Sequence, residues 1–131
     1  MSFNELLINT AENVFNQYIE KHPDIEVLSL ATTDGFPVFN RSSSHVNMDD
    51  DKMAAASSTL YSVSNAVSKQ LLEKSFKITY IEAEQGNVGF ISLSIQDKDF
   101  VLAMSTSETM NLGQLRVFIN RIANEILQTA S

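Results

Sequence analysis

The chain has 131 residues, of which 44% are hydrophobic and 19% charged, so we expect one soluble globular domain over residues 1–131. It contains no cysteine, which excludes disulfides, thiolate metal sites and a cysteine nucleophile. The formal net charge of −7 makes nucleic acid an unfavourable partner, because phosphates would be repelled. The sequence has no export signal and no apolar run long enough for membrane insertion, so a cytoplasmic location is expected.

The first predicted element is a helix that begins after Ser2 and ends near Lys21. Ser2 and Glu5 have the spacing of a capping box, in which each side chain accepts from a backbone N–H of the first turn. Apolar residues then recur at helical spacing. Pro23 disfavours helical backbone at His22, so the helix should end there.

Two strands joined by a tight turn at Asp34-Gly35 are predicted next. Residues 25–33 carry apolar side chains on both faces, which indicates a strand covered on both sides. We expect Ile25 and Val27 to share one of these faces. Pro37 begins the second strand and lacks an N–H, which favours the edge of a sheet.

A long helix is predicted from about Asp49 to Lys74. Asn47 or Asp49 can cap it, and two further aspartates fall in the first turn, where the helix dipole favours negative charge.

This long helix has two unlike faces. At about 100° per residue, the larger apolar face is expected to pack on the sheet, and its members are Met53, Ala56, Leu60, Val63, Val67 and Leu71. The other face is rich in small side chains: Ala54, Ser57, Tyr61, Ser64, Ser68 and Leu72. It is either an ordinary exposed face or a helix–helix contact, in which small side chains let two backbones approach and Tyr61 and Leu72 act as anchors.

Three strands follow, at residues 76–84, 88–96 and 100–106, and their short connectors at 85–87 and 97–99 predict an antiparallel meander. The first of these strands contains neither Pro nor Gly. At a sheet edge, its unpaired N–H and C=O groups could pair with a second copy of the chain about a two-fold axis.

The last predicted element is a helix with a second capping box, formed by Asn111 and Gln114. Its apolar stripe consists of Leu115, Phe118, Ile119, Ile122 and Ile126. The predicted order is therefore helix, two strands, helix, three strands, helix.

No catalytic or cofactor motif is present in the sequence. It lacks the glycine-rich phosphate loops and the G-x-S-x-G elbow of a serine nucleophile. His45 precedes three aspartates, but helix capping explains the acids better than a metal site does. Asp97 and Asp99 are explained by turn chemistry. We therefore expect no enzyme activity, no cofactor and no metal.

Two segments resemble the Roadblock/LC7 family. Residues 27–38 read VLSLATTDGFPV and resemble that family's hairpin, and residues 53–60 read MAAASSTL and resemble the Ala-rich start of its central helix. The resemblance covers nearly the whole chain and is nearest to the bacterial MglB-like branch. It implies an α/β (α+β) fold of the profilin type, αββαβββα, with a five-stranded antiparallel sheet between one central helix and two terminal helices.

The resemblance also implies a function. It points to a non-catalytic homodimer, formed through the central helix and third strand, that regulates or binds a cytoplasmic Ras-like small GTPase. A dimeric scaffold or light-chain-like subunit with nucleotide-independent binding and a small-ligand sensor remain alternatives. The arginines, Arg41, Arg116 and Arg121, include no obvious finger for a GTPase site. The residues predicted to form the dimer or partner interface are Ala54, Ser57, Tyr61, Ser64, Ser68, Leu72, Phe76, Ile78 and Tyr80.

Overall fold

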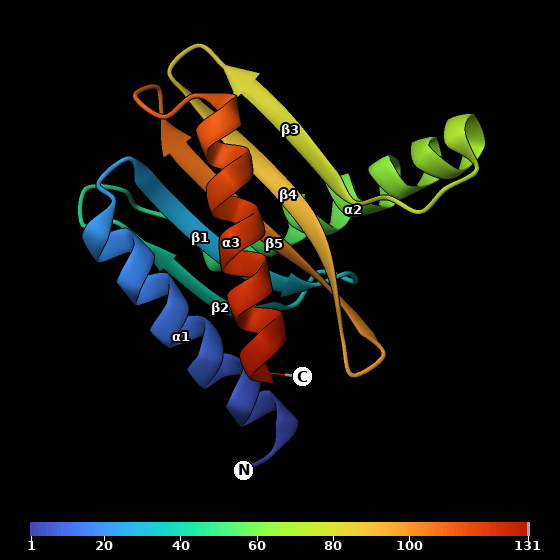
Figure 1. The fold of residues 1–131 in the computed structure, drawn as a ribbon, viewed down its shortest axis with the longest axis horizontal. Coiled ribbons are helices and arrows are strands. Elements are labelled where there is room, and N and C mark those ends of the chain that lie inside the picture. The colour runs from blue at the N-terminus through green and yellow to red at the C-terminus, as the bar shows by residue number, and fades with distance from the viewer. Residues whose placement is uncertain (131) are drawn as a thin grey trace.

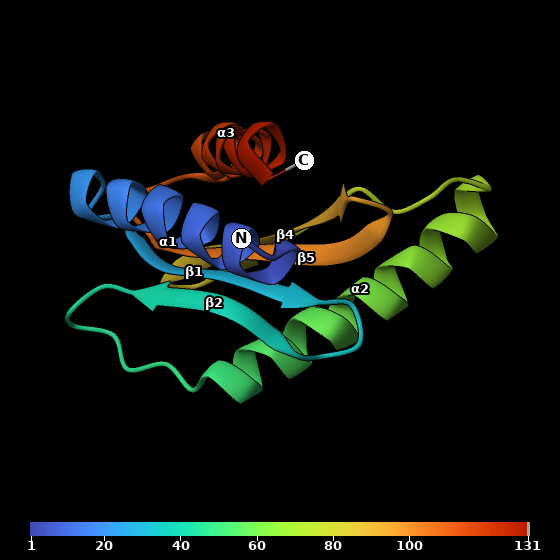
Figure 2. The same ribbon diagram turned by 90° about the horizontal axis from the view of Figure 1, so that it is seen from below.

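The computed structural model describes residues 1–130, whose helices and strands follow the predicted order. They are α1 (Phe3–Lys21), β1 (Ile25–Thr32), β2 (Pro37–Ser42), α2 (Asp50–Leu72), β3 (Ile78–Ala83), β4 (Gly86–Ile95), β5 (Lys98–Ser107) and α3 (Leu112–Ala130). Figures 1 and 2 show three layers, with α1 and α3 on one face of the sheet and α2 crossing the other. This confirms the profilin-like α+β architecture.

The sheet is five-stranded and wholly antiparallel, in the order β2-β1-β5-β4-β3. β2 and β3 are therefore the edge strands. Pro37 begins β2 at one edge, as predicted, because an edge strand tolerates the missing N–H.

A β-bulge corrects the predicted faces of β1. Its pairing with β5 shifts register between Ile25 and Val27. Ile25 consequently joins the core beneath α1 and α3, whereas Val27 joins the core beneath α2. The prediction that they share a face was wrong, since the bulge interrupts the two-residue alternation of a regular strand.

The turns are set by local chemistry. At Asp34-Gly35 the predicted turn forms, with Gly35 at a positive φ of 101° and Thr32 N–H donating to the Phe36 carbonyl at 2.9 Å. The other two hairpin loops are shorter than predicted, with two residues each between β3 and β4 and between β4 and β5. The second places Gln96 and Asp97 at φ 51° and 64°, as a type I′ turn requires.

Each helix begins at a predicted capping residue. Ser2 Oγ accepts from the Glu5 N–H at 3.2 Å, and Asp49 Oδ1 accepts from two first-turn N–H groups at 3.0 and 3.2 Å. Asn111 and Gln114 accept from each other's backbone N–H at 2.8 and 3.0 Å. α2 ends at Leu72, two residues earlier than predicted.

The two sides of the sheet differ in how much they bury. Beneath α1 and α3 lies a large apolar cluster that contains Phe15, Leu28, Leu102 and most of the α3 stripe. Beneath α2 the cluster is much smaller, and Met53 is its only buried α2 member. The α2 side therefore contributes less to folding, because stabilisation follows the apolar area removed from water.

The face that α2 turns to the sheet is the small one, which corrects the predicted orientation. Ala54 and Ser57 are 0% exposed. Of the residues expected to pack on the sheet, Met53 is buried and Leu60 is half-buried, but the remainder are exposed: Ala56, Val63, Val67 and Leu71. Small side chains occupy the sheet-facing position because they let the helix backbone approach the strands closely.

This orientation predicts opposite outcomes for two neighbouring alanines. Ala54→Leu should lower the free energy of unfolding by about 1–3 kcal/mol, because the added methylenes have no room. Ala56→Leu, at an exposed position, should change it by no more than about 0.5 kcal/mol. Urea denaturation of both variants measures the difference. Equal costs, or a larger cost at Ala56, would contradict the orientation.

Candidate partner-binding surface

The second half of α2 projects beyond the sheet. The helix contacts β2, β1, β5 and β4 as it crosses. Figures 1 and 2 show its C-terminal turns continuing past the strands before the chain returns to β3. Glu73 reverses the direction in a left-handed conformation, with φ 56°, and its N–H donates to the Lys69 carbonyl at 3.1 Å. The first half of α2 therefore packs on the sheet, whereas the second half extends past the strands into solvent.

Three contacts tie the projecting helix to β3 and to the chain that leads into it. Ser64 Oγ and Thr79 Oγ1 are 2.8 Å apart, and the Asn65 carboxamide oxygen accepts from the Phe76 N–H at 3.2 Å. The Tyr61 and Phe76 rings meet edge to face, with centroids 5.9 Å apart. We call this set the clasp. The clasp holds α2 and the start of β3 together. Phe76 is buried, and its backbone N–H is bonded to a side chain of α2.

The apolar flank of the projecting helix is exposed. Val63 is 56% exposed, Val67 47%, Leu71 77% and Leu72 65%. Single exposed apolar residues are ordinary, but a contiguous set marks an interaction surface.

A groove of about 500 Å³ runs between this half of α2 and the chain leading into β3. Val63, Val67 and Leu72 line it from the helix, and Phe76 lines it from the returning chain. Lys74 and Lys77 are exposed on its rim. Among the described residues that line the groove, none is acidic.

The outer edge of β3 adds unpaired backbone groups to the same surface. The Lys77 carbonyl accepts from Ser92 N–H, so alternate residues from Lys77 onward direct their backbone groups to β4. Ile78, Tyr80 and Glu82 therefore direct theirs to the open edge. The strand lacks the prolines and bulges that usually protect such an edge.

The structure separates the residues of the predicted interface into three groups. Ala54, Ser57 and Phe76 are buried within the chain itself. Tyr61, Ser64 and Ser68 are half-buried along the clasp and groove, and Leu72 is exposed beside them. Ile78 and Tyr80 lie on the opposite face of the sheet and pack against the core beneath α3. That any of them meets a partner stays a prediction.

Sequence reasoning missed Val63, Val67, Leu71, Lys74 and Lys77 as surface residues. It assigned the larger apolar stripe to the sheet by size alone. The available signal was the length of α2, whose 23 residues span about 34 Å and exceed the width of five strands.

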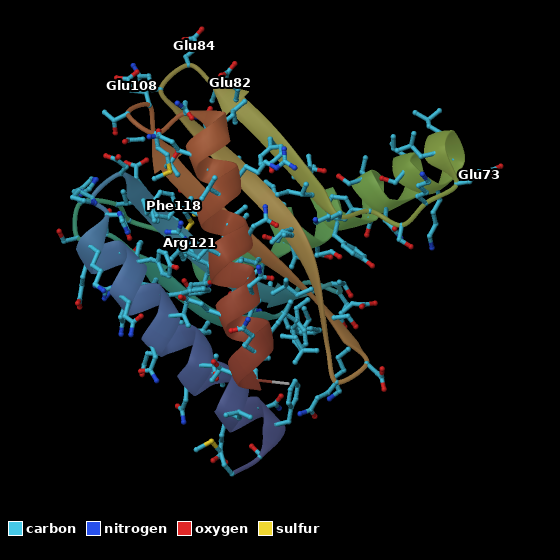
Figure 3. The ribbon with its side chains drawn as sticks, in the orientation of Figure 1. Glu73, Glu82, Glu84, Glu108, Phe118 and Arg121 are labelled. Carbon is cyan, nitrogen blue, oxygen red and sulfur yellow. The ribbon has the colours of Figure 1, made fainter. Side chains whose placement is uncertain are left out.

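A second cluster of side chains lies between α1 and α3. Arg121 stacks over the Phe118 ring at 5.4 Å from its centroid, and the His22 ring meets Phe118 at 4.6 Å (Figure 3). Burial raises the pKa of Tyr18, and the nearby Glu125 carboxylate raises it further, so its hydroxyl stays protonated at neutral pH. These contacts join the two helices to each other. Arg121 is thus engaged with its own chain.

The described residues hold no cluster of three metal-ligating His, Cys, Asp or Glu side chains. Within residues 1–130, no helix has the length and apolar character needed to cross a membrane.

Solved structures share this fold. The gliding protein MglB of Thermus thermophilus aligns with a TM-score of 0.80 at 16% identity, over 95% of this chain and 90% of that one. An MglB with a tetrameric arrangement aligns with a TM-score of 0.78 at 17% identity, over 95% and 93%. A Roadblock/LC7 domain from Streptomyces avermitilis aligns with a TM-score of 0.64 at 14% identity, over 88% and 87%.

These alignments show that the chain has the Roadblock/LC7 fold in its MglB-like form, as its sequence resemblance implied. No protein-family model matches the sequence, and no curated protein matches it significantly.

The clasp predicts a stability effect at Asn65. Asn65→Ala removes the acceptor of the buried Phe76 N–H and should lower the free energy of unfolding by about 1–3 kcal/mol. Asn65→Asp keeps an acceptor and should recover part of that loss. Gln70→Ala, an exposed change on the same helix, is the matched control and should be neutral within about 0.5 kcal/mol in urea denaturation. An Asn65→Ala variant as stable as the control would refute the clasp.

Proposed function

We propose that the chain is a homodimeric, non-catalytic regulator or binding partner of a Ras-like small GTPase in the cytoplasm. The observation that carries the proposal is the exposed apolar flank of α2 beside the open edge of β3. Both features belong to one surface, and the chain itself leaves both uncovered. An exposed apolar helix that projects from its domain favours association, because water-exposed apolar area is removed when a partner covers it.

A second copy fits the two halves of this surface at once. An antiparallel pairing of β3 with the β3 of a second copy would satisfy the outward backbone groups of Ile78, Tyr80 and Glu82. A two-fold axis through that pairing keeps each copy's α2 on the same side of the extended sheet. The apolar flanks could then approach each other. One solved MglB has a tetrameric arrangement, so self-association is compatible with this fold.

The GTPase part of the proposal rests on the family resemblance. Roadblock/LC7-type proteins, and the MglB-like branch in particular, imply a role in binding or regulating Ras-like GTPases. The sequence contains no catalytic motif, which agrees with a chain that acts on the GTPase by binding it. Arg121 packs on Phe118 and is a poor finger for a partner's site.

The dimer is tested by paired valine substitutions. Val67→Arg places a charge on the apolar flank and should raise the dimer dissociation constant at least about tenfold, which corresponds to about 1.4 kcal/mol. Val117→Arg is the control, since Val117 is similarly exposed, at 53%, on α3. Light scattering at several concentrations measures both. A monomeric wild type at micromolar concentration, or equal effects of the two variants, would overturn the dimer.

GTPase binding is tested with the intact protein. We expect binding to a Ras-like GTPase with at least about tenfold preference for one nucleotide state, because regulators act through differential affinity for two conformations. Titration calorimetry with candidate GTPases loaded with GDP or a non-hydrolysable GTP analogue measures it. Binding of equal strength in both states would favour a scaffold, and no binding to any candidate would overturn the GTPase role.

A further inference from the structure

Two hollows lie between α1 and α3, on the face of the sheet opposite α2 (Figure 2). The larger, of about 590 Å³, reaches Leu6 near the start of α1, and the smaller, of about 200 Å³, is lined by Lys21 and Arg121. Gln17 and Glu125 line both hollows, so the two meet, and together we call them the terminal-helix groove. The proposed homodimer uses α2 and the β3 edge, whereas α1 packs on β1 and β2 at the opposite edge of the sheet.

Three carboxamides stand in a row along the α1 wall of this groove. Asn9, Asn13 and Gln17 are four residues apart, and all three are exposed. Within residues 1–130, the side chains of Asn13 and Gln17 form no hydrogen bond, and Asn9 makes only a 3.9 Å contact with Met1 Sδ. A carboxamide offers both a donor group and an acceptor, so each can bond the C=O and the N–H of one peptide residue.

The spacing of this row matches that of an extended peptide. Four residues of an α-helix rise about 6 Å, whereas alternate residues of an extended chain are about 6.6 Å apart. Alternate residues of such a chain direct their N–H and C=O groups to the same side. Three carboxamides can therefore bond three alternate residues with a mismatch of about 1 Å over the whole row.

The α3 wall of the groove contains an acceptor that lacks a donor. Glu125 Oε2 is buried and has no hydrogen-bond partner within residues 1–130. A buried acceptor without a donor lowers stability. A backbone N–H of a peptide in the groove would supply the donor, because the residues between those that face α1 direct their N–H groups to the other wall.

The two ends of the groove differ in charge. Lys21 and Arg121 lie at one end, and neither forms an ion pair within residues 1–130. Arg121 stacks on Phe118, but a stacked guanidinium still presents N–H groups at its edge. Leu6 and Met1 make the other end apolar. The 15-residue rise from Leu6 to Lys21 is about 22 Å, the length of about seven extended residues.

We propose that the terminal-helix groove binds an extended segment of a protein partner, about seven residues long. The carboxamide row bonds the backbone of the segment. An apolar side chain lies at the Leu6 end, and an Asp or Glu carboxylate lies at Lys21 and Arg121, where the charges are complementary. The inference goes beyond the proposed function, since it involves neither the GTPase nor the surface between two copies.

The probe for the test is a nine-residue peptide, selected from a random peptide library on the intact wild-type protein and then labelled with a fluorophore. We expect a peptide with an apolar residue and an acidic residue near opposite ends, whose dissociation constant in fluorescence anisotropy is below about 100 μM. A library that yields no peptide of that affinity overturns the inference.

The carboxamide row is tested by a matched pair of variants. Asn13→Ala/Gln17→Ala should raise the dissociation constant of the peptide at least about tenfold, because two residues of the row no longer bond its backbone. Asn4→Ala/Asn124→Ala removes two exposed carboxamides outside the groove and should change it by no more than about twofold. Circular dichroism checks that both variants are folded. Equal effects of the two variants contradict the groove as the binding site.

The cationic end is tested by a double-mutant cycle between protein and peptide. Lys21→Gln should weaken binding of the selected peptide at least about threefold, and should have a smaller effect on a peptide whose acidic residue is replaced by Gln. Raising the salt concentration should weaken only the peptide that keeps its acidic residue. Independent effects of the two changes refute the contact between that carboxylate and Lys21.

Failure of this inference is distinguishable from failure of the proposed function. Val67→Arg should bind the peptide as the wild type does, because Val67 lies on α2 across the sheet from the groove. Loss of peptide binding in Val67→Arg, with binding retained in Asn13→Ala/Gln17→Ala, assigns the peptide to the α2 surface and overturns the inference. A chain that binds the peptide in the groove but binds no candidate GTPase loses the proposed function and keeps the peptide site.

Discussion

The length of α2 relative to the sheet determines what this molecule leaves uncovered. Its 23 residues extend about 34 Å, whereas five strands, with about 4.8 Å between neighbours, span about 19 Å. Figures 1 and 2 show that α2 crosses the sheet and continues past its edge, so part of its length has no strands beneath it. The exposed flank, the groove and the returning chain all follow from this mismatch, because each is made by the part of α2 that has no sheet to cover.

The small residues at the start of α2 decide which way that projecting part faces. Ala54 and Ser57 are fully buried against the sheet, and a straight helix carries the same orientation forward. Ser64 then meets Thr79, and Val63 and Val67 are left on the flank. The packing of the first two turns thus fixes which side chains are exposed several turns later.

The predictable parts of the fold were those with local causes. Ser2, Asp49, Asn111 and Gly35 each act within a few residues, so capping and turn chemistry could be inferred from spacing alone. The bulge before Val27 and the rotation of α2 depend on strands distant in sequence. Nothing near Val67 indicates that the helix continues past the sheet, and an apolar stripe has the same sequence pattern whether it meets strands or a partner. The sequence therefore located α2 and β3, whereas the face that α2 turns to the sheet was wrongly predicted, and the predicted interface itself stays a prediction.

The uneven burial on the two faces of the sheet explains how the chain can leave one surface open and remain folded. The large core beneath α1 and α3 supplies most of the apolar burial, so the α2 side can retain exposed valines and leucines without losing the fold. The α2 core is small, and the clasp adds to it: Ser64 bonds Thr79 in β3, and Asn65 accepts from the Phe76 N–H just before β3, beside the Tyr61–Phe76 ring contact. Binding favours a surface that is both exposed and already ordered. Its apolar area is still available to a partner, and little conformational entropy is lost when the partner binds.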